Sequence, residues 1–279
     1  MRPVFHELTR RELDVLAENM PQALGVFGVS GSGLLMAAKY LASQVGAVPE
    51  IVYPEKKDEI DLESGSITID IIRRLQTMTR TKTSSRRCIV IYMADTMKHE
   101  AQNAFLKLLE EPADNISFVL LAHNSDRLLP TVISRLQRIT IRPITTEQSD
   151  MLLTRLKVDD PKKRQQLLFL ADGKPSRLSK LSNDDELFES ETKALLAARK
   201  FVQGSLYDRL VICQSIKSSK LEAERLVDYS IRLIKHDIAT KKTAEDQAIS
   251  QLKRLERAAG RLKSNGNPRL ALAAAVLTT

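Results

Sequence analysis

The sequence predicts an α/β domain with a parallel sheet, followed by an all-α region. In the first half of the chain, short apolar runs rich in β-branched or aromatic residues alternate with amphipathic helical patterns. From Thr145 onward, helical patterns follow one another without a convincing strand. Apolar runs that do not alternate with polar residues are typical of strands covered on both faces, as in a parallel sheet with crossover helices.

The expected elements follow in order along the chain. We predict strands at residues 23–27, 51–53, 88–93, 118–122 and 139–141, with helices at 36–41, 67–78 and 97–109 between them. In the second half we predict helices at about 146–156, 161–171, 175–182, 185–203, 206–217, 220–241, 244–263 and 268–278. In the 244–263 helix, for example, Ile249, Leu252 and Leu255 belong to an apolar stripe at helical spacing, which predicts packing of helix on helix.

Composition excludes several classes of protein. With 279 residues, of which 43% are hydrophobic, the chain can form about two globular domains and is not disordered throughout. Its two cysteines, Cys88 and Cys213, cannot form a disulfide framework or a four-cysteine zinc site. No apolar run approaches a membrane span, and the N-terminus lacks the apolar core of a signal peptide. We therefore expect a soluble, cytoplasmic protein that is not associated with a membrane.

The net charge of +8 is concentrated in the second half of the chain. Residues 1–143 carry a net charge of +1 and residues 144–279 a net charge of +7. An excess of this size permits a polyanionic partner but does not require one, because many solvated helical faces have a similar charge.

A glycine loop follows the first predicted strand and precedes a helix, which is the setting of a phosphate-binding loop. Its residues 28–35 read GVSGSGLL, and Gly28 and Gly33 have the spacing of that motif. Leu34 and Leu35 stand where the motif has a phosphate-binding lysine and a hydroxyl ligand for Mg²⁺. Gly28, Gly31 and Gly33 still permit weak anion or residual nucleotide binding. The alternative is a purely structural glycine turn.

The acidic motif of a nucleotide site is also altered in this chain. The predicted strand at 88–93 ends where such a site places an aspartate for Mg²⁺ and a glutamate for water. Tyr92 and Met93 occupy these positions, and Asp95 is poorly placed to replace both. We therefore expect that this chain does not hydrolyse ATP and holds no cofactor.

Two long segments resemble the bacterial clamp-loader family of DNA polymerase III. Residues 100–112 (EAQNAFLKLLEEP) are similar to its A-x-N-A-L-L-K-x-L-E-E-P segment, and residues 128–138 (LLPTVISRLQR) resemble L-L-P-T-x-x-S-R-C-Q-R. Weaker matches lie at residues 173–177, the place of the lid-domain sensor arginine, and at residues 265–272 (NGNPRLAL). With both nucleotide motifs eroded, the chain resembles the delta-prime branch of this family, which is related to gamma/tau.

The resemblance implies an AAA+ fold in three parts. These are a RecA-like P-loop NTPase domain at residues 1–144, a three-helix lid at 145–183 and a C-terminal helical collar for oligomerisation at 184–279. It also implies a hetero-oligomeric ring with delta and gamma/tau subunits, which places a sliding clamp on primer–template DNA. Many relatives carry a four-cysteine zinc module after the phosphate-loop helix; this chain has neither the cysteines nor the length there, so no metal is expected.

The resemblance also implies roles for single residues. Arg135 matches the arginine finger, which would stabilise transition-state charge in a neighbour's ATP site. The alternative for Arg135 is a surface or ion-paired arginine. Asn124 and Arg177 match sensor positions, and with Leu34 in the loop they are either remnants or, for Arg177, a lid-packing residue. Glu110, at the end of its helix, is either solvated or a contact with a neighbour.

The densest basic cluster of the first half includes Arg73, Arg74 and Arg80. Residues 67–73, with the pattern I-x-x-D-x-I-R, resemble the family helix that faces the DNA channel, where Lys and Arg follow phosphates without reading bases. A solvated helix face is nearly as good an interpretation.

The expected function is thus a non-hydrolysing, delta-prime-like clamp-loader subunit within the polymerase III holoenzyme, which donates an arginine finger. The alternatives are a divergent gamma/tau-type ATPase, or an AAA+ scaffold or DNA-binding protein of another complex.

Overall fold

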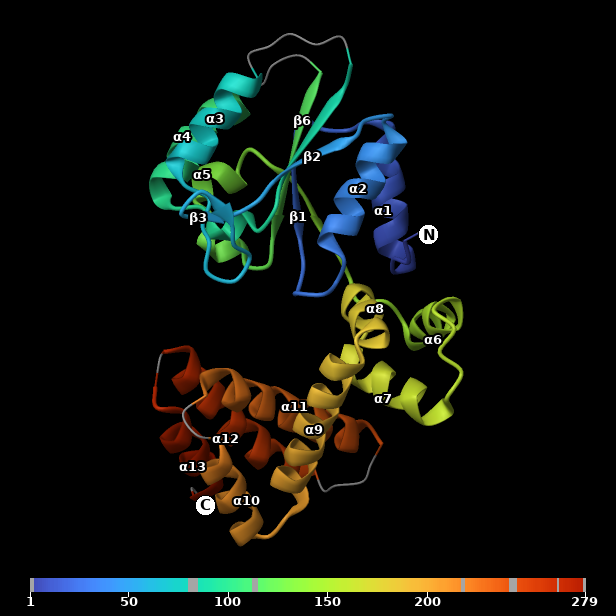
Figure 1. Ribbon diagram of the computed structural model, residues 1–279, viewed down its shortest axis with the longest axis vertical. Helices are drawn as coiled ribbons and strands as arrows, with labels where there is room; N and C mark the ends of the chain where they lie inside the picture. The colour runs from blue at the N-terminus through green and yellow to red at the C-terminus, as the bar shows by residue number, and fades with distance from the viewer. Residues whose placement is uncertain are drawn as a thin grey trace. The chain divides into compact units, whose positions relative to one another are not determined.

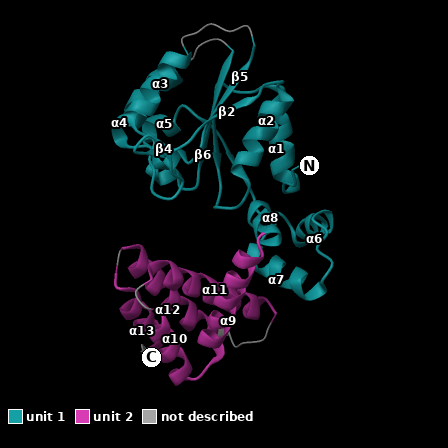
Figure 2. Ribbon diagram, viewed as in Figure 1, with its two compact units in different colours: residues 1–183 teal, residues 184–279 magenta. Residues whose placement is uncertain are grey.

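The computed structural model describes residues 3–79, 85–111, 115–216, 219–240, 245–264 and 266–277. The chain forms two compact units, residues 1–183 and 184–279 (Figure 2). Arg80, one of the predicted DNA-binding residues, lies outside the described residues, as do Pro112 and Asn265 of the family-like segments.

The first unit is built on a parallel sheet (Figure 1). The sheet has five strands in the order β2-β5-β6-β1-β7. The strands are β1 (Ala23–Phe27), β2 (Pro49–Val52), β5 (Arg87–Ile91), β6 (Ile116–Ala122) and β7 (Gln137–Thr140). In the middle of the sheet, Val26 of β1 pairs with Leu121 of β6 and Ile139 of β7. All five predicted strands are present. The first has the predicted bounds, and the bounds of the others shift by at most two residues.

Helices cover both faces of this sheet (Figure 1). On one face, α1 (Glu7–Glu18) and α2 (Leu34–Gln44) pack against Val119 and Leu121. On the other face, α3 (Ile69–Thr79), α4 (His99–Glu110) and the short α5 (Pro130–Ile133) pack against Phe118 and Leu120. Successive side chains of a strand point to opposite faces, so a continuous apolar strand such as β6 supplies both cores.

A small hairpin that the sequence analysis did not predict follows β2. It consists of β3 (Glu55–Lys56) and β4 (Glu59–Ile60), and the intervening Lys57 and Asp58 have φ angles of 54° and 62°. Two central residues with positive φ are the requirement of the tight hairpin turn whose twist matches its strands. Two short 3₁₀ helices, η1 (Ala94–Thr96) and η2 (Ser125–Arg127), follow β5 and β6.

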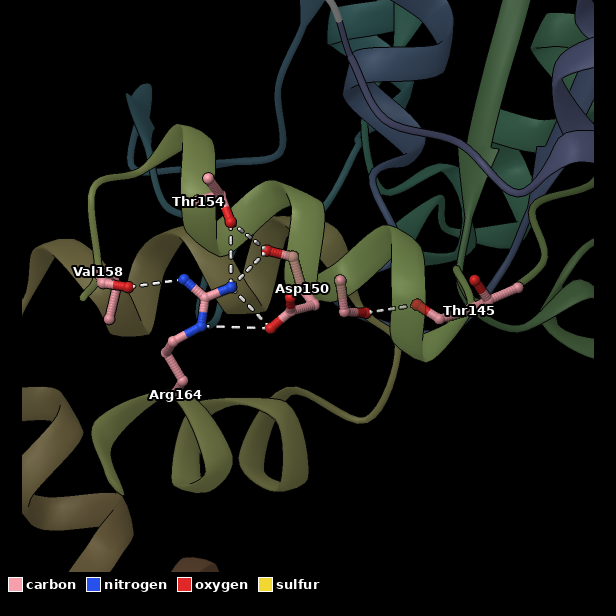
Figure 3. Close-up of polar contacts among 6 residues, drawn as sticks. Thr145, Asp150, Thr154, Val158 and Arg164 are labelled. Atoms are coloured by element: carbon pink, nitrogen blue, oxygen red, sulfur yellow. Dashed lines mark hydrogen bonds and ion pairs between the residues drawn. The ribbon is translucent and has the colours of Figure 1, made fainter. Parts of the chain in front are cut away.

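Three helices, α6 (Thr146–Arg155), α7 (Pro161–Ala171) and α8 (Pro175–Asn183), complete the first unit. Thr145 and Gln148 form a reciprocal capping box at the start of α6, and Asp160 caps α7 with Pro161 at its first position. Arg164 of α7 joins α6 to α7 (Figure 3). Its guanidinium donates to Asp150 Oδ1 at 2.7 Å, to Thr154 Oγ1 at 3.0 Å and to the Val158 carbonyl at 2.8 Å.

The second unit consists of helices in its described residues. They are α9 (Asp185–Gln203), α10 (Leu206–Ser215), α11 (Lys220–Ala239), α12 (Glu245–Lys263) and α13 (Pro268–Leu277). Asp184 caps α9 through a 2.9 Å bond from the Leu187 N–H, and Tyr229 donates a buried hydrogen bond to Glu191. The expected fold class, an α/β domain followed by helices, is confirmed, whereas the three-part division with a boundary at residues 144/145 stays a prediction.

Within the part of the chain that the structure describes, no helix is both long and apolar enough to cross a bilayer. The same residues contain no group of three or more His, Cys, Asp or Glu side chains placed to hold a metal ion. Cys88 and Cys213 are both buried, and burial raises the pKa of each thiol to about 11. Each thiol is therefore protonated at neutral pH and is a poor metal ligand or nucleophile.

Candidate nucleotide loop and arginine site

The loop that follows β1 has a backbone that only glycine adopts readily. Gly31 has φ +84°, and Gly33, the N-cap of α2, has φ +96°. Both angles lie in the left-handed region, where a Cβ is disfavoured. The glycines predicted to bind phosphate thus form a tight strand-to-helix turn.

The side chain in the lysine position of this loop is built into the core. Leu34 is the first residue of α2, is 4% exposed and belongs to the apolar cluster that contains Leu24 and Val26. Ser32 of the same loop is also buried. The leucines at positions 34 and 35 provide neither a cation nor an oxygen ligand, so this loop does not fit a Mg²⁺-bound triphosphate.

The start of α8 lies directly against the loop. The N–H groups of Ser176 and Arg177 both donate to the Gly31 carbonyl, at 3.0 and 3.4 Å. A Cβ added to Gly31 would lie 3.0 Å from the Arg177 Cβ. The structure therefore places Arg177, predicted as a sensor-like residue, beside the loop, where its backbone N–H donates to Gly31.

After the end of β5, Tyr92 occupies a position of the acidic motif and packs against Tyr53, which follows β2. The ring of Tyr92 contacts that of Tyr53 edge-on, with 5.6 Å between centroids, and Met93 has φ +53°. Asp95 accepts a 3.3 Å bond from the Asn124 backbone N–H. The Asn124 side chain accepts from the Asp126 N–H at 2.9 Å, so this predicted sensor residue caps its own 3₁₀ turn.

Arg135 lies between α5 and β7, with its side chain 38% exposed. Its Nη2 donates to Glu110 Oε1 at 2.7 Å, and its Nη1 donates to the Thr131 carbonyl at 3.0 Å. The arginine is therefore both ion-paired and accessible. The sequence analysis left open what Glu110 does, and the motif itself gives no signal that the two side chains meet.

The predicted DNA-binding arginines of α3 are partly neutralised. Arg74 forms an ion pair with Glu55 of β3, and the Arg73 guanidinium lies 3.6 Å from the Asp70 carboxylate. Both arginine side chains remain more than half exposed. Arg87, at the start of β5, instead forms two 2.7 Å bonds with Glu50, which lower the pKa of that carboxyl group.

The sheet order, the glycine turn before α2 and the helices that follow define a RecA-like α/β domain followed by a helical region, which is the fold seen in AAA+ proteins. Two solved structures share this fold. A DNA polymerase III gamma subunit-related protein from Thermotoga maritima superimposes with a TM-score of 0.54 at 19% identity, over 95% of this chain and 97% of that one. The RuvB Holliday junction branch migration motor from the same organism gives a TM-score of 0.51 at 13% identity, over 98% and 91% of the two chains.

Residues 42–145 match the family described as DNA polymerase III, delta subunit. The chain is 32% identical over 112 residues to DNA polymerase III subunit delta' of Bacillus subtilis, covering 40% of this chain and 33% of that protein. It is 28% identical over 166 residues to the Pseudomonas aeruginosa subunit of the same name, covering 58% and 47%. These matches span less than half of each relative, and they confirm the resemblance to bacterial DNA polymerase III clamp-loader subunits.

Proposed function

We propose that this chain acts as a non-hydrolysing, delta-prime-like subunit of a DNA polymerase III clamp loader. In this role it helps to load a sliding clamp on primer–template DNA and lends Arg135 to the ATP site of a neighbouring subunit. The observation that carries the proposal is the burial of Leu34 in the core at the position of the phosphate-binding lysine. The named relatives and the clamp-loader motifs support the same assignment.

The loss of hydrolysis follows from charge. Phosphoryl transfer depends on positioning and on cations that neutralise the phosphate oxygens. Here leucines replace the lysine and the Mg²⁺ ligand, and Tyr92 and Met93 replace the two acids. The loop keeps backbone N–H groups and two serine hydroxyls but no charged side chain, and part of its polar surface is engaged with α8 through the Gly31 carbonyl.

Arg135 supports a role in trans. A ring of head-to-tail subunits brings one surface of each subunit against a different surface of the next. The guanidinium has five N–H donors, and two of its nitrogens make the contacts to Glu110 and Thr131. Further donors on this half-exposed side chain are free to meet a phosphate of the gamma/tau neighbour, whereas the chain's own loop lacks the groups to hold one.

The isolated chain is expected to show no ATP turnover above background in a coupled phosphate-release assay. The double variant Leu34→Lys with Leu35→Thr restores the loop residues and is expected to stay inactive, because Tyr92 and Met93 still provide no acid. A gamma/tau-type subunit serves as the positive control. Turnover by the unmodified chain would contradict the non-hydrolysing role and favour the gamma/tau-type ATPase.

Replacement of Arg73 and Arg74 by glutamine is expected to lower the affinity of the assembled complex for primer–template DNA. Each lost phosphate contact reduces the slope of log K against log salt by about 1. Arg73→Gln should have the larger effect, since Arg73 is the more exposed of the two and its 3.6 Å pair with Asp70 is looser than the pair of Arg74 with Glu55. Binding is measured by fluorescence anisotropy over a salt series, with the exposed Arg155→Gln on α6 as the control. An unchanged slope would mean that α3 presents a solvated face.

A further inference from the structure

The proposed arginine finger is held by a carboxylate of its own chain. Glu110 is the last residue of α4, and Arg135 follows α5, 25 residues further along the chain. Their side chains meet at 2.7 Å. Resting on the proposed function, we propose that Glu110 is a positioning residue for Arg135, which fixes the guanidinium before it meets the neighbour's nucleotide.

Both ends of this ion pair are attached to the same core. Phe105 anchors α4 and is fully buried, and Val132 does the same for α5. Leu136, next to Arg135, is 7% exposed in the same cluster. The helix or turn that carries each charged group is thus anchored in the core, so the orientation of the guanidinium depends on its two hydrogen bonds.

The two acceptors that hold the Arg135 guanidinium lie on different helices. Thr131, four residues earlier, accepts from Nη1 through its carbonyl, and Glu110 of α4 accepts from Nη2. With the Thr131 contact alone, the planar guanidinium group could still rotate about this single hydrogen bond. The second contact, on a separate helix, fixes the plane of the guanidinium and leaves its other N–H groups for a ligand.

Positioning is favoured over a latch that withholds the arginine. The side chains of Arg135 and Glu110 are 38% and 50% exposed, and ion pairs with this exposure contribute little to stability. Such a pair is too weak to keep the arginine from a multiply charged phosphate. A free arginine, however, carries large rotamer entropy, and the loss of this freedom opposes engagement of the phosphate. Prior fixation by Glu110 reduces that loss.

The test uses the clamp loader reconstituted with its gamma/tau and delta subunits, the clamp and primer–template DNA. Glu110→Ala is expected to lower kcat for DNA-stimulated ATP hydrolysis about threefold to tenfold, with little change in the KM for ATP. Glu110→Gln keeps a hydrogen-bond acceptor without the charge, so its kcat should lie between those of the unmodified chain and Glu110→Ala. Glu110→Asp, whose carboxylate is one methylene further away, should recover part of the loss. Size-exclusion chromatography and thermal melting should show normal assembly and folding.

Comparisons with three other variants decide whether the positioning role holds. The double variant Glu110→Ala with Arg135→Ala should be no slower than Arg135→Ala alone, because Glu110 acts only through Arg135. Glu100→Ala, which removes an exposed carboxylate at the opposite end of α4, should leave kcat unchanged. If Arg135→Ala has no effect, the proposed function fails. If Arg135→Ala is slow but Glu110→Ala is unchanged or faster, only the positioning role fails.

Discussion

Arg135→Ala is expected to reduce ATP hydrolysis at the neighbouring site that we propose this chain completes by about a thousandfold, the lower end of the range for an arginine finger. The reason is that the variant loses the planar, permanently charged guanidinium, which can bind a phosphate through two parallel hydrogen bonds. DNA-stimulated ATP turnover of the reconstituted complex should fall accordingly, by less in total where other ATP sites remain active. Folding and assembly should persist, because a half-exposed ion pair contributes about 0–1 kcal/mol.

Two further variants separate the finger from a general charge effect. Arg135→Lys keeps the charge but loses the planar fork, so most of the activity should still be lost. Arg138→Ala removes an exposed cation three residues later, on β7, and should leave turnover unchanged. Equal losses for Arg135→Ala and Arg138→Ala would indicate that net charge matters and that no finger exists. An unchanged rate for Arg135→Ala would refute the role directly.

Most of the helices and strands could be predicted from the sequence because each depends mainly on residues close together in the chain. The apolar run of β6 and the Asp160–Pro161 start of α7 determine their elements without help from distant residues. The predicted nucleotide loop was recognisable from glycine spacing, and the structure adds that Leu34 is buried. The β3–β4 hairpin was missed because Lys57 and Asp58 adopt positive φ, which non-glycine residues rarely do.

The contacts of the candidate site could not be read from the sequence, since they join residues far apart in the chain. Arg135 meets Glu110 across 25 residues, and the start of α8 meets Gly31 across some 145 residues. Arg74 meets Glu55 across a hairpin that was not predicted. Charge counting along the chain therefore overstated the free positive charge on α3, because the compensating carboxylate lies on another element.

Phe105→Ala is expected to destabilise the first unit by about 3–5 kcal/mol, the range for removing a buried aromatic ring. Phe105 is fully buried, and its ring meets that of Phe118 of β6 edge-on at 5.4 Å between centroids. Removal of the ring loses this contact and leaves a cavity between α4 and the sheet. Because α4 carries Glu110 at its end, the loss should also loosen the support of Arg135.

Native-state hydrogen exchange of the β6 and α4 amides measures this effect in the intact chain, in which two units need not unfold together. Lys107→Ala, two residues away on the exposed side of α4, should change the free energy of opening by less than about 0.5 kcal/mol. If Phe105→Ala also changes it by less than about 1 kcal/mol, then α4 is not held by this core. The rigid support of Glu110 would then have to come from the helix end itself, and the geometry of the Arg135 site would no longer follow from the packing of the sheet.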